Sequence, residues 1–243
     1  MTREALDAPA IFVSDVHLKQ GDAKELDLFL AFLRGHARSA RQLVIHGDLF
    51  EFYVGPRQGR DPWWAPLQEA LRELAQAGTK ITLLHGNRDY QIESDFAQGS
   101  VRVLSGDWHC LAGEQRLRVS HGDEMCIHDW SYQVFGRGLL RTALVRWLVR
   151  SLPFCISRLL ATSYRGVSKA RRRGKSYSRL GSILDGAKQH AEGQDVLIAG
   201  HIHELARTEL FPGRGAVLWT TGAWEDGPNY IHWDGVEFRA IRL

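Results

Sequence analysis

Seven side chains of metal-ligand type stand in five short polar clusters along the chain. They are two carboxylates, four imidazoles and one amide: Asp15, His17, Asp48, Asn87, His121, His201 and His203. Such a mixture of oxygen and nitrogen donors suits Mn²⁺, Fe²⁺ or Zn²⁺ better than Ca²⁺ or a thiolate-bound metal. Because seven donors exceed what one ion needs, we expect two divalent ions with one carboxylate shared between them.

The elements that must position these side chains are short strands. Each cluster follows an apolar run of strand type, and four of these runs lie at residues 11–13, 43–45, 81–84 and 196–198. Helix-type stretches separate the first three runs, at about 23–37 and 64–77. The β-α-β-α-β order predicts a layered α/β domain. Loops past strand ends are where such a sheet builds its site, so we expect the five clusters to converge.

Two further parts of the chain have β patterns. Residues 101–120 predict a hairpin that turns at Gly113-Glu114, because apolar and polar residues alternate beyond the turn. Residues 206–242 predict three or four short antiparallel strands, separated by glycine- and proline-containing turns.

Residues 124–180 depart from this pattern of strand-type and helix-type stretches. Residues 136–180 hold ten arginines, two lysines and no acidic residue, whereas the other residues hold 19 basic and 28 acidic side chains. Several apolar side chains share one arc of a helical wheel: Leu139, Leu140, Ala143, Leu144 and Trp147. We predict a helical lid inserted at 124–180 into a single domain that spans 1–243. A basic surface helix packed on its own domain is the alternative, and a basic amphipathic helix also suits an anionic membrane surface.

The amino-acid composition limits the class of protein to which this chain can belong. Apolar residues make up 44% and charged residues 24%, as in an ordinary soluble globular protein. We find no apolar run long enough for a transmembrane helix and read no signal peptide. Three cysteines without metal-type pairing favour a reducing compartment, so we expect a cytoplasmic protein. We also expect a monomer, and the charge of the basic segment suits attachment to the inner face of the cell membrane. Too few aromatic residues stand among the arginines for a base-stacking groove, so we expect no nucleic acid partner.

The order of the clusters resembles the calcineurin-like metallophosphoesterase superfamily. Its five blocks match Asp15/His17, Gly47-Asp48, Gly86-Asn87, His121 and Gly200-His201/His203. The resemblance implies a four-layer α/β/β/α sandwich with a dinuclear metal centre at the strand ends. It implies one ion held by Asp15, His17, Asp48 and His203, and a second held by Asp48, Asn87, His121 and His201. Asp48 would bridge the ions, and a hydroxide formed from water between them would attack phosphorus.

Arg88 stands where most members of that superfamily have histidine. An arginine is a poor general acid at neutral pH because its pKa lies above about 12. It is suited to a bidentate grip on phosphate. Asp89 and Asp123 are expected to orient the metal ligands from behind.

The combination of Gly47-Asp48-Leu49-Phe50-Glu51 with Gly86-Asn87-Arg88-Asp89 resembles a narrower family, the UDP-2,3-diacylglucosamine hydrolases of lipid A biosynthesis. This resemblance implies cleavage of a pyrophosphate to UMP and 2,3-diacylglucosamine 1-phosphate (lipid X). It implies Mn²⁺ as the metal, with Fe²⁺ and Zn²⁺ as alternatives, and a lid that holds the acyl chains of an amphipathic nucleotide-sugar substrate. It implies catalytic roles for Asp48, Arg88 and His201. It implies substrate contacts by Asn87, Arg88, Asp129, Tyr132, Arg165, Ser168, Arg172, Lys175 and His201.

Two other functions stay open at this point. The chain departs from the family pattern at Arg171, Arg172, Glu204, Leu205 and residues 56–60. A phosphoesterase that acts on another nucleotide or amphipathic phosphoester is therefore the second hypothesis. A non-catalytic anion-binding scaffold is the third, although the intact ligand set counts against it.

Overall fold

The computed structural model describes residues 3–93, 96–128, 142, 145, 147–148, 151, 180–213 and 215–243. The twelve strands of the described chain form two sheets of six strands each. The first sheet, called here the β2 sheet, has the order β12 (Phe238–Arg242), β11 (Asn229–Trp233), β2 (Ala10–Val13), β3 (Gln42–His46), β4 (Lys80–Leu84) and β5 (Arg102–Leu104). The second, called the β8 sheet, has the order β1 (Glu4–Ala5), β6 (Trp108–Ala112), β7 (Gln115–Val119), β8 (Val196–Ala199), β10 (Val217–Thr220) and β9 (Ala206–Glu209).

Both sheets are mixed, and parallel strands form their centres. Strands β2, β3, β4 and β5 run parallel to one another, and β11 pairs with β2 antiparallel. In the other sheet β8 runs parallel to both of its neighbours, β7 and β10. The carboxyl ends of β2, β3 and β4 therefore lie at one edge, and those of β7 and β8 lie at one edge of the other sheet.

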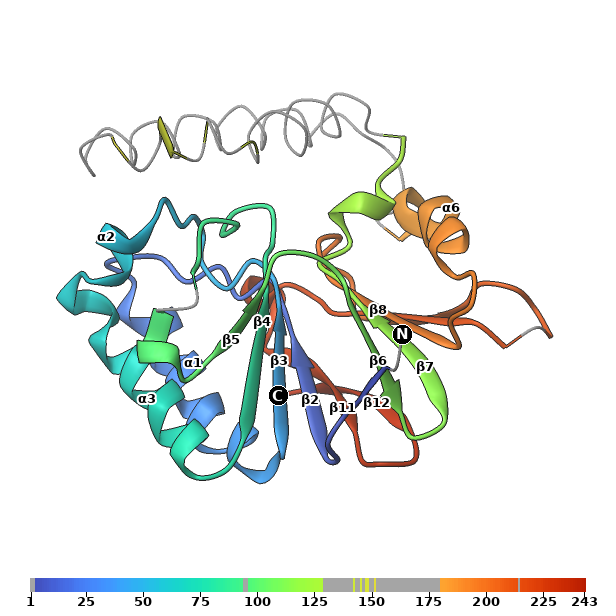
Figure 1. The fold of residues 1–243 in the computed structure, drawn as a ribbon, viewed down its shortest axis with the longest axis horizontal. Helices are drawn as coiled ribbons and strands as arrows, with labels where there is room; N and C mark the ends of the chain where they lie inside the picture. The colour runs from blue at the N-terminus through green and yellow to red at the C-terminus, as the bar shows by residue number, and fades with distance from the viewer. Residues whose placement is uncertain are drawn as a thin grey trace.

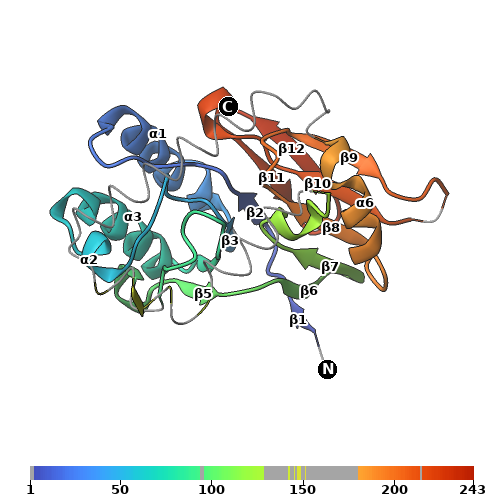
Figure 2. The same ribbon diagram turned by 90° about the horizontal axis from the view of Figure 1, so that it is seen from above.

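Helices cover the outer faces of the two sheets (Figures 1 and 2). The longer helices are α1 (Ala23–Arg34), α3 (Ala65–Gln76) and α6 (Gly181–His190), and α2 (Pro56–Gly59) is short. Short 3₁₀ turns are η1 (Ala37–Ser39), η2 (Pro62–Trp64), η3 (Phe96–Gly99), η4 (Asp123–Met125) and η6 (Trp224–Asp226). Helices α1 and α3 pack against the β2 sheet in one apolar core, and α6 packs against the β8 sheet in another.

The alternation of side chains along each strand produces these layers. On β2, Ile11 and Val13 pack with α1 and α3, whereas Phe12 packs between the two sheets. On β8, Ile198 packs between the sheets and Leu197 packs under α6. The buried strands therefore carry apolar residues on both faces, and the molecule is the predicted four-layer α/β/β/α sandwich.

The predicted elements are largely confirmed. The four apolar runs are strands β2, β3, β4 and β8, and the two helix-type stretches are α1 and α3. Strands β6 and β7 pair antiparallel around Gly113 as expected. The C-terminal region holds four strands, but β9 and β10 join one sheet while β11 and β12 join the other. Strand β10 also runs parallel to β8, which the prediction of antiparallel strands missed.

The helical lid stays a prediction, because most of residues 124–180 lie outside the described part of the chain. Within the described ranges, no helix has both the length and the apolar character that crossing a membrane requires.

Candidate dinuclear metal centre

The loops after β2, β3, β4, β7 and β8 converge and bring the seven predicted ligands together. Backbone hydrogen bonds hold these loops against one another: Asp15 N donates to Gly47 O at 3.2 Å, and His17 N donates to Asp48 O at 3.1 Å. Within the β8 sheet, Gly200 N donates to His121 O at 2.8 Å, and between the two sheets His201 N donates to Asp15 Oδ2 at 2.9 Å. The convergence that the sequence predicts is therefore present, and it draws on both sheets.

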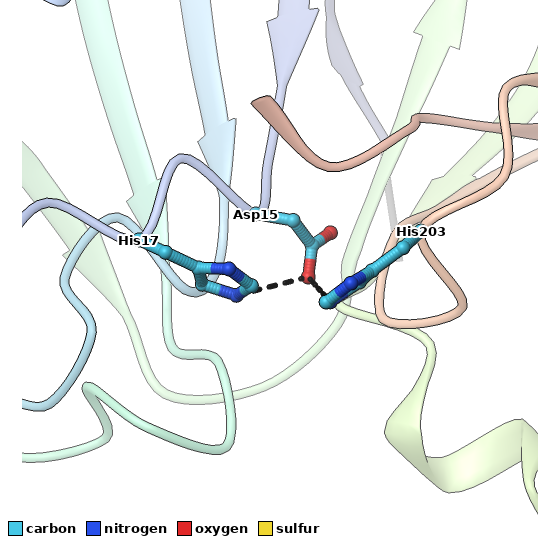
Figure 3. Close-up of side chains that lie close together, drawn as sticks. All are labelled: Asp15, His17 and His203. Carbon is cyan, nitrogen blue, oxygen red and sulfur yellow. Dashed lines mark ion pairs between the residues drawn. The ribbon is translucent and has the colours of Figure 1, made fainter. Parts of the chain in front are cut away.

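The first group of ligands surrounds one oxygen of Asp15 (Figure 3). His203 Nε2 lies 3.3 Å from Asp15 Oδ1, and His17 Nε2 lies 3.6 Å from the same atom. Among the described residues, Asp15 Oδ1 and His17 Nε2 are buried without a hydrogen-bond partner of good geometry. Buried polar atoms without partners are rare and need an explanation, and a cation between these donors would supply one.

The second group centres on Asn87. Its Oδ1 atom lies 2.9 Å from His121 Nε2 and 2.9 Å from His201 Nδ1. His121 Nε2 also lies 3.6 Å from Asp48 Oδ2. This same carboxylate oxygen lies 3.5 Å from His17 Nε2, which belongs to the first group. Asp48 Oδ2 therefore faces both groups, as a bridging carboxylate must.

These distances fit a pair of bound ions. Metal–ligand bonds to nitrogen and oxygen are about 2.0–2.2 Å long, so two donors on one ion lie about 3–3.5 Å apart. The donor separations of 2.9–3.6 Å fall close to that range. Two sets of three side chains each have donor atoms close enough to hold an ion: Asp15, His17 and His203, and Asp15, Asp48 and His121. The residues present therefore fit two divalent cations.

The backbone at the ligands is strained. Seven non-glycine residues of the described chain have positive φ, and five of them are predicted ligands: Asp15 (52°), His17 (57°), Asp48 (53°), His201 (67°) and His203 (59°). Left-handed backbone at a residue with a side chain costs of order 1–3 kcal/mol and persists where a functional site requires it. The left-handed backbone at these five residues directs their side chains into the space that the loops share.

Charge in the buried site is balanced between carboxylates and imidazoles. Burial alone would raise the pKa of Asp48, but His121, His17 and Arg88 outweigh it and hold that pKa far below its usual range. Burial alone would lower the pKa of His121, but the charges of Asp48 and Asp15 raise it. The carboxylates of Asp15, whose pKa is also lowered by the nearby histidines, and of Asp48 therefore stay ionised in the metal-free site and can bind cations.

Asp89 holds together the backbone of the loops that follow β3 and β4. Its carboxylate accepts hydrogen bonds from the backbone N–H groups of Gly86 at 2.8 Å, Leu49 at 2.7 Å and Asp48 at 3.3 Å. Burial and the nearby charge of Asp48 raise the pKa of Asp89 to about 7. Asp123, the other residue expected to orient ligands, is also buried.

Arg88 lies at the centre but contacts carboxylates. Its Nε atom lies 3.2 Å from Asp48 Oδ2, and its Nη1 atom donates to Glu51 Oε2 at 3.1 Å. Its backbone N–H donates to Asp48 Oδ1 at 2.9 Å. The guanidinium is therefore oriented by two acidic side chains beside the shared ligand, and its contact with phosphate stays a prediction.

Some predicted site residues lie outside the described part of the chain, and some residues at the centre were not predicted. Six predicted substrate contacts lie outside the described residues: Asp129, Tyr132, Arg165, Ser168, Arg172 and Lys175. Three buried polar residues at the centre could not be predicted from the sequence: Ser14, Glu51 and Thr221. Ser14 and Glu51 stand within ligand-bearing clusters, which is a weak signal, whereas Thr221 carries none.

Comparison with known proteins identifies the family. A UDP-2,3-diacylglucosamine hydrolase from Ralstonia nicotianae is 32% identical over 232 residues, which cover 90% of this chain and 85% of that protein. The chain belongs to the UDP-2,3-diacylglucosamine hydrolase family. A relative of the same name from Pseudomonas aeruginosa is 34% identical over 220 residues, covering 88% of this chain and 90% of that one. The UDP-2,3-diacylglucosamine hydrolase of Aromatoleum aromaticum is 31% identical and covers 93% of each chain.

Comparisons with protein-family models and with solved structures give less information about the family. No protein-family model matches the chain. Similar solved structures include an archaeal phosphodiesterase, at 13% identity over 97% of this chain and 99% of that chain with a TM-score of 0.44. A dimetal phosphatase from Danio rerio is 14% identical over 97% of this chain and 99% of that chain, also with a TM-score of 0.44. At these TM-scores we draw no conclusion from the structural similarity. Membership of a hydrolase family and the intact ligand set make the protein a metallophosphoesterase enzyme and leave no support for the scaffold hypothesis.

Proposed function

We propose that this protein hydrolyses the pyrophosphate bond of UDP-2,3-diacylglucosamine to UMP and 2,3-diacylglucosamine 1-phosphate. The observation that carries the hydrolytic chemistry is the position of Asp48 Oδ2, 3.5 Å from His17 Nε2 and 3.6 Å from His121 Nε2. This position between the two groups of donors supports the sharing of Asp48 Oδ2 by two ions. The substrate is inferred from the name that the relatives bear at 31–34% identity.

Each ligand has a task in this proposal. Asp15, His17 and His203 hold one ion, Asn87, His121 and His201 hold the other, and Asp48 is common to both. When bound, the ions supply positive charge to the phosphoryl oxygens and lower the pKa of water. We propose Mn²⁺ as the metal, with Fe²⁺ and Zn²⁺ as alternatives, because the donor set suits all three ions and the family resemblance favours Mn²⁺.

Arg88 is proposed to bind the phosphoryl group directly. Its guanidinium is fixed beside Asp48 by Glu51, at 3.1 Å from Oε2. A planar cation held next to the shared ligand can donate two hydrogen bonds to phosphate oxygens and stabilise the charge that develops there. Its high pKa excludes a role as proton donor.

The remaining parts of the proposal rest on the sequence. We propose that residues 124–180 act as the helical lid of a single domain and bind the acyl chains. The apolar arc and the positive charge of this segment suit an amphipathic anionic substrate. The same charge supports peripheral attachment of a cytoplasmic monomer to an anionic membrane surface.

Product analysis tests the proposal. The purified protein is loaded with Mn²⁺ and incubated with UDP-2,3-diacylglucosamine, and the products are separated and identified by mass spectrometry. We expect UMP and 2,3-diacylglucosamine 1-phosphate in equal amounts, and no product in the presence of excess EDTA. Release of UDP would contradict the proposal because it places the cut between sugar and phosphate. A protein that cleaves bis-p-nitrophenyl phosphate but not this substrate would support the second hypothesis instead.

A further inference from the structure

Behind Asp15 lies a pair of buried hydroxyl groups that the proposed chemistry does not use. Ser14 Oγ donates to Asp15 Oδ2, the oxygen that points away from His17 and His203 in Figure 3. Thr221 Oγ1 lies 2.6 Å from Ser14 Oγ. The side chains of Ser14, Asp15 and Thr221 are fully buried. Buried hydroxyls in such a series have a fixed arrangement, because no water competes for their hydrogen bonds.

The direction of these hydrogen bonds follows from the chemistry of the groups. An ionised carboxylate only accepts, so Ser14 must donate its hydroxyl proton to Asp15. Ser14 Oγ then accepts from Thr221, whose hydroxyl has one proton to give. His46 Nδ1 faces the carbonyl oxygen of Ser120 at 3.2 Å and must carry the ring proton. His46 Nε2, at 3.5 Å from Thr221 Oγ1, is too distant to draw that proton away from Ser14 at 2.6 Å.

A backbone donor completes the surroundings of this oxygen. His201 N donates to Asp15 Oδ2 at 2.9 Å. Asp15 Oδ2 thus accepts two hydrogen bonds, one from Ser14 and one from His201. Asp15 Oδ1 is left for a cation, with His203 Nε2 at 3.3 Å and His17 Nε2 at 3.6 Å. The carboxylate therefore has one oxygen for the protein and one for the metal.

The two hydroxyls come from different sheets. Ser14 follows β2, and Thr221 follows β10 and is held beside β8 by a hydrogen bond from its N–H to Ala199 O at 3.0 Å. Gly200 makes room for them, since a Cβ atom there would lie 2.2 Å from Ser14 Oγ and 2.4 Å from Asp15 Oδ2. The close packing at this point fixes the hydroxyl pair and the carboxylate as one unit.

We propose that Thr221 and Ser14 are positioning residues that orient Asp15 as a ligand through Oδ1 and thereby set the affinity of the first metal position. The inference rests on the proposed metal centre. Partners that orient ligands in this way change metal affinity by about 10–100-fold when they are removed. Thr221 acts only through Ser14, so its effect depends on the serine hydroxyl.

Metal binding by matched variants tests this inference. Thr221→Val removes the hydroxyl at nearly constant volume, Thr221→Ser keeps it, and Ser14→Ala removes the group that Thr221 acts through. Affinity for Mn²⁺ is measured on the metal-free full chain by competition with a chelator, and thermal unfolding of the same metal-free protein is the structural readout. We expect Thr221→Val and Ser14→Ala to weaken one of two Mn²⁺ ions about 10-fold or more. Thr221→Ser should bind both ions as the wild type does.

Three outcomes would overturn the inference. The first is wild-type Mn²⁺ affinity in both Thr221→Val and Ser14→Ala. The second is a lower unfolding midpoint in Thr221→Val with Mn²⁺ affinity unchanged, which indicates a purely structural role. The third is a double variant whose loss of affinity equals the product of the two single losses, because a relay predicts no further loss beyond Ser14→Ala. These measurements need no substrate, so they stand apart from any failure of the proposed reaction.

Discussion

Replacing Asp48 by asparagine tests the centre most directly, because the shape of the side chain is kept while its charge is lost. Asp48 Oδ2 lies 3.5 Å from His17 Nε2, 3.6 Å from His121 Nε2 and 3.2 Å from Arg88 Nε. An amide offers one oxygen and one NH₂ group, so it cannot present an anionic oxygen to both groups of ligands. At least one ion loses a ligand, and both lose the shared negative charge.

The size of the effect follows from that geometry. Removal of one group that stabilises transition-state charge costs about 10²–10³ in rate. Loss at two metal positions therefore predicts a fall in kcat of about 10⁴-fold or more, which corresponds to about 5.5 kcal/mol. We also expect Asp48→Asn to retain fewer than two Mn²⁺ ions per chain after dialysis.

Two assays separate metal loss from misfolding. Bound Mn²⁺ is counted by elemental analysis, and turnover is measured on bis-p-nitrophenyl phosphate and UDP-2,3-diacylglucosamine. Asp27→Asn, which changes an exposed carboxylate on α1, is the matched control and should behave as the wild type. Two Mn²⁺ ions bound at wild-type affinity in Asp48→Asn, together with turnover within about 10-fold of the wild type, would refute the shared-ligand assignment.

Three further predictions concern the substrate contact, packing and pH. Arg88→Ala should lower kcat/KM about 100-fold or more while bound Mn²⁺ stays at the wild-type level; lost Mn²⁺ would instead make the residue part of the metal site. Gly186→Ala places a Cβ atom 2.1 Å from the carbonyl oxygen of Met125, so chemical denaturation should show a loss of about 3 kcal/mol, whereas Gly106→Ala, with no atom within 4 Å, should cost much less. Burial lowers the pKa of His46 from 6.5 to about 4, so its contribution to the stability of the metal-free protein is fully present above pH 6.5 and is lost as the pH falls towards 4. Wild type should therefore lose about 3 kcal/mol more than His46→Asn over that interval, and parallel pH profiles would contradict this.

Much of the fold could be predicted because its central strands, such as β2, β3 and β8, are buried on both faces. Short runs such as Ile11-Phe12-Val13 and Val196-Leu197-Ile198 are apolar throughout, since alternate side chains enter different cores. Pairing between distant strands could not be predicted in the same way. Strand β10 joins β8 in parallel and β11 joins β2 in the other sheet, because the η6 region between them crosses from one sheet to the other. No pattern in a short segment of the sequence predicts that the chain crosses between the sheets at this point.

The composition of the metal centre could also be predicted, but the orientation of its groups could not. Residue types and their places after strands were enough to indicate the seven side chains that the structure brings together. The positive φ angles at Asp15 and Asp48 depend on how neighbouring loops pack. The contacts of Arg88 with Asp48 and Glu51 likewise depend on the direction of side chains in the assembled site.

The amino-acid sequence by itself determined the layered α/β architecture, the donor set and the family resemblance, because strand periodicity and ligand chemistry are local properties. The tertiary structure alone decided that Asp48 Oδ2 faces both groups of ligands and that Thr221 Oγ1 lies 2.6 Å from Ser14 Oγ, although the two residues are 207 positions apart in the chain. The physical reason is that a hydrogen bond or a shared ligand depends on the distance between atoms in the folded chain and not on their separation along the sequence. Long-range packing of two sheets, which no short segment of the chain specifies, brings those atoms together.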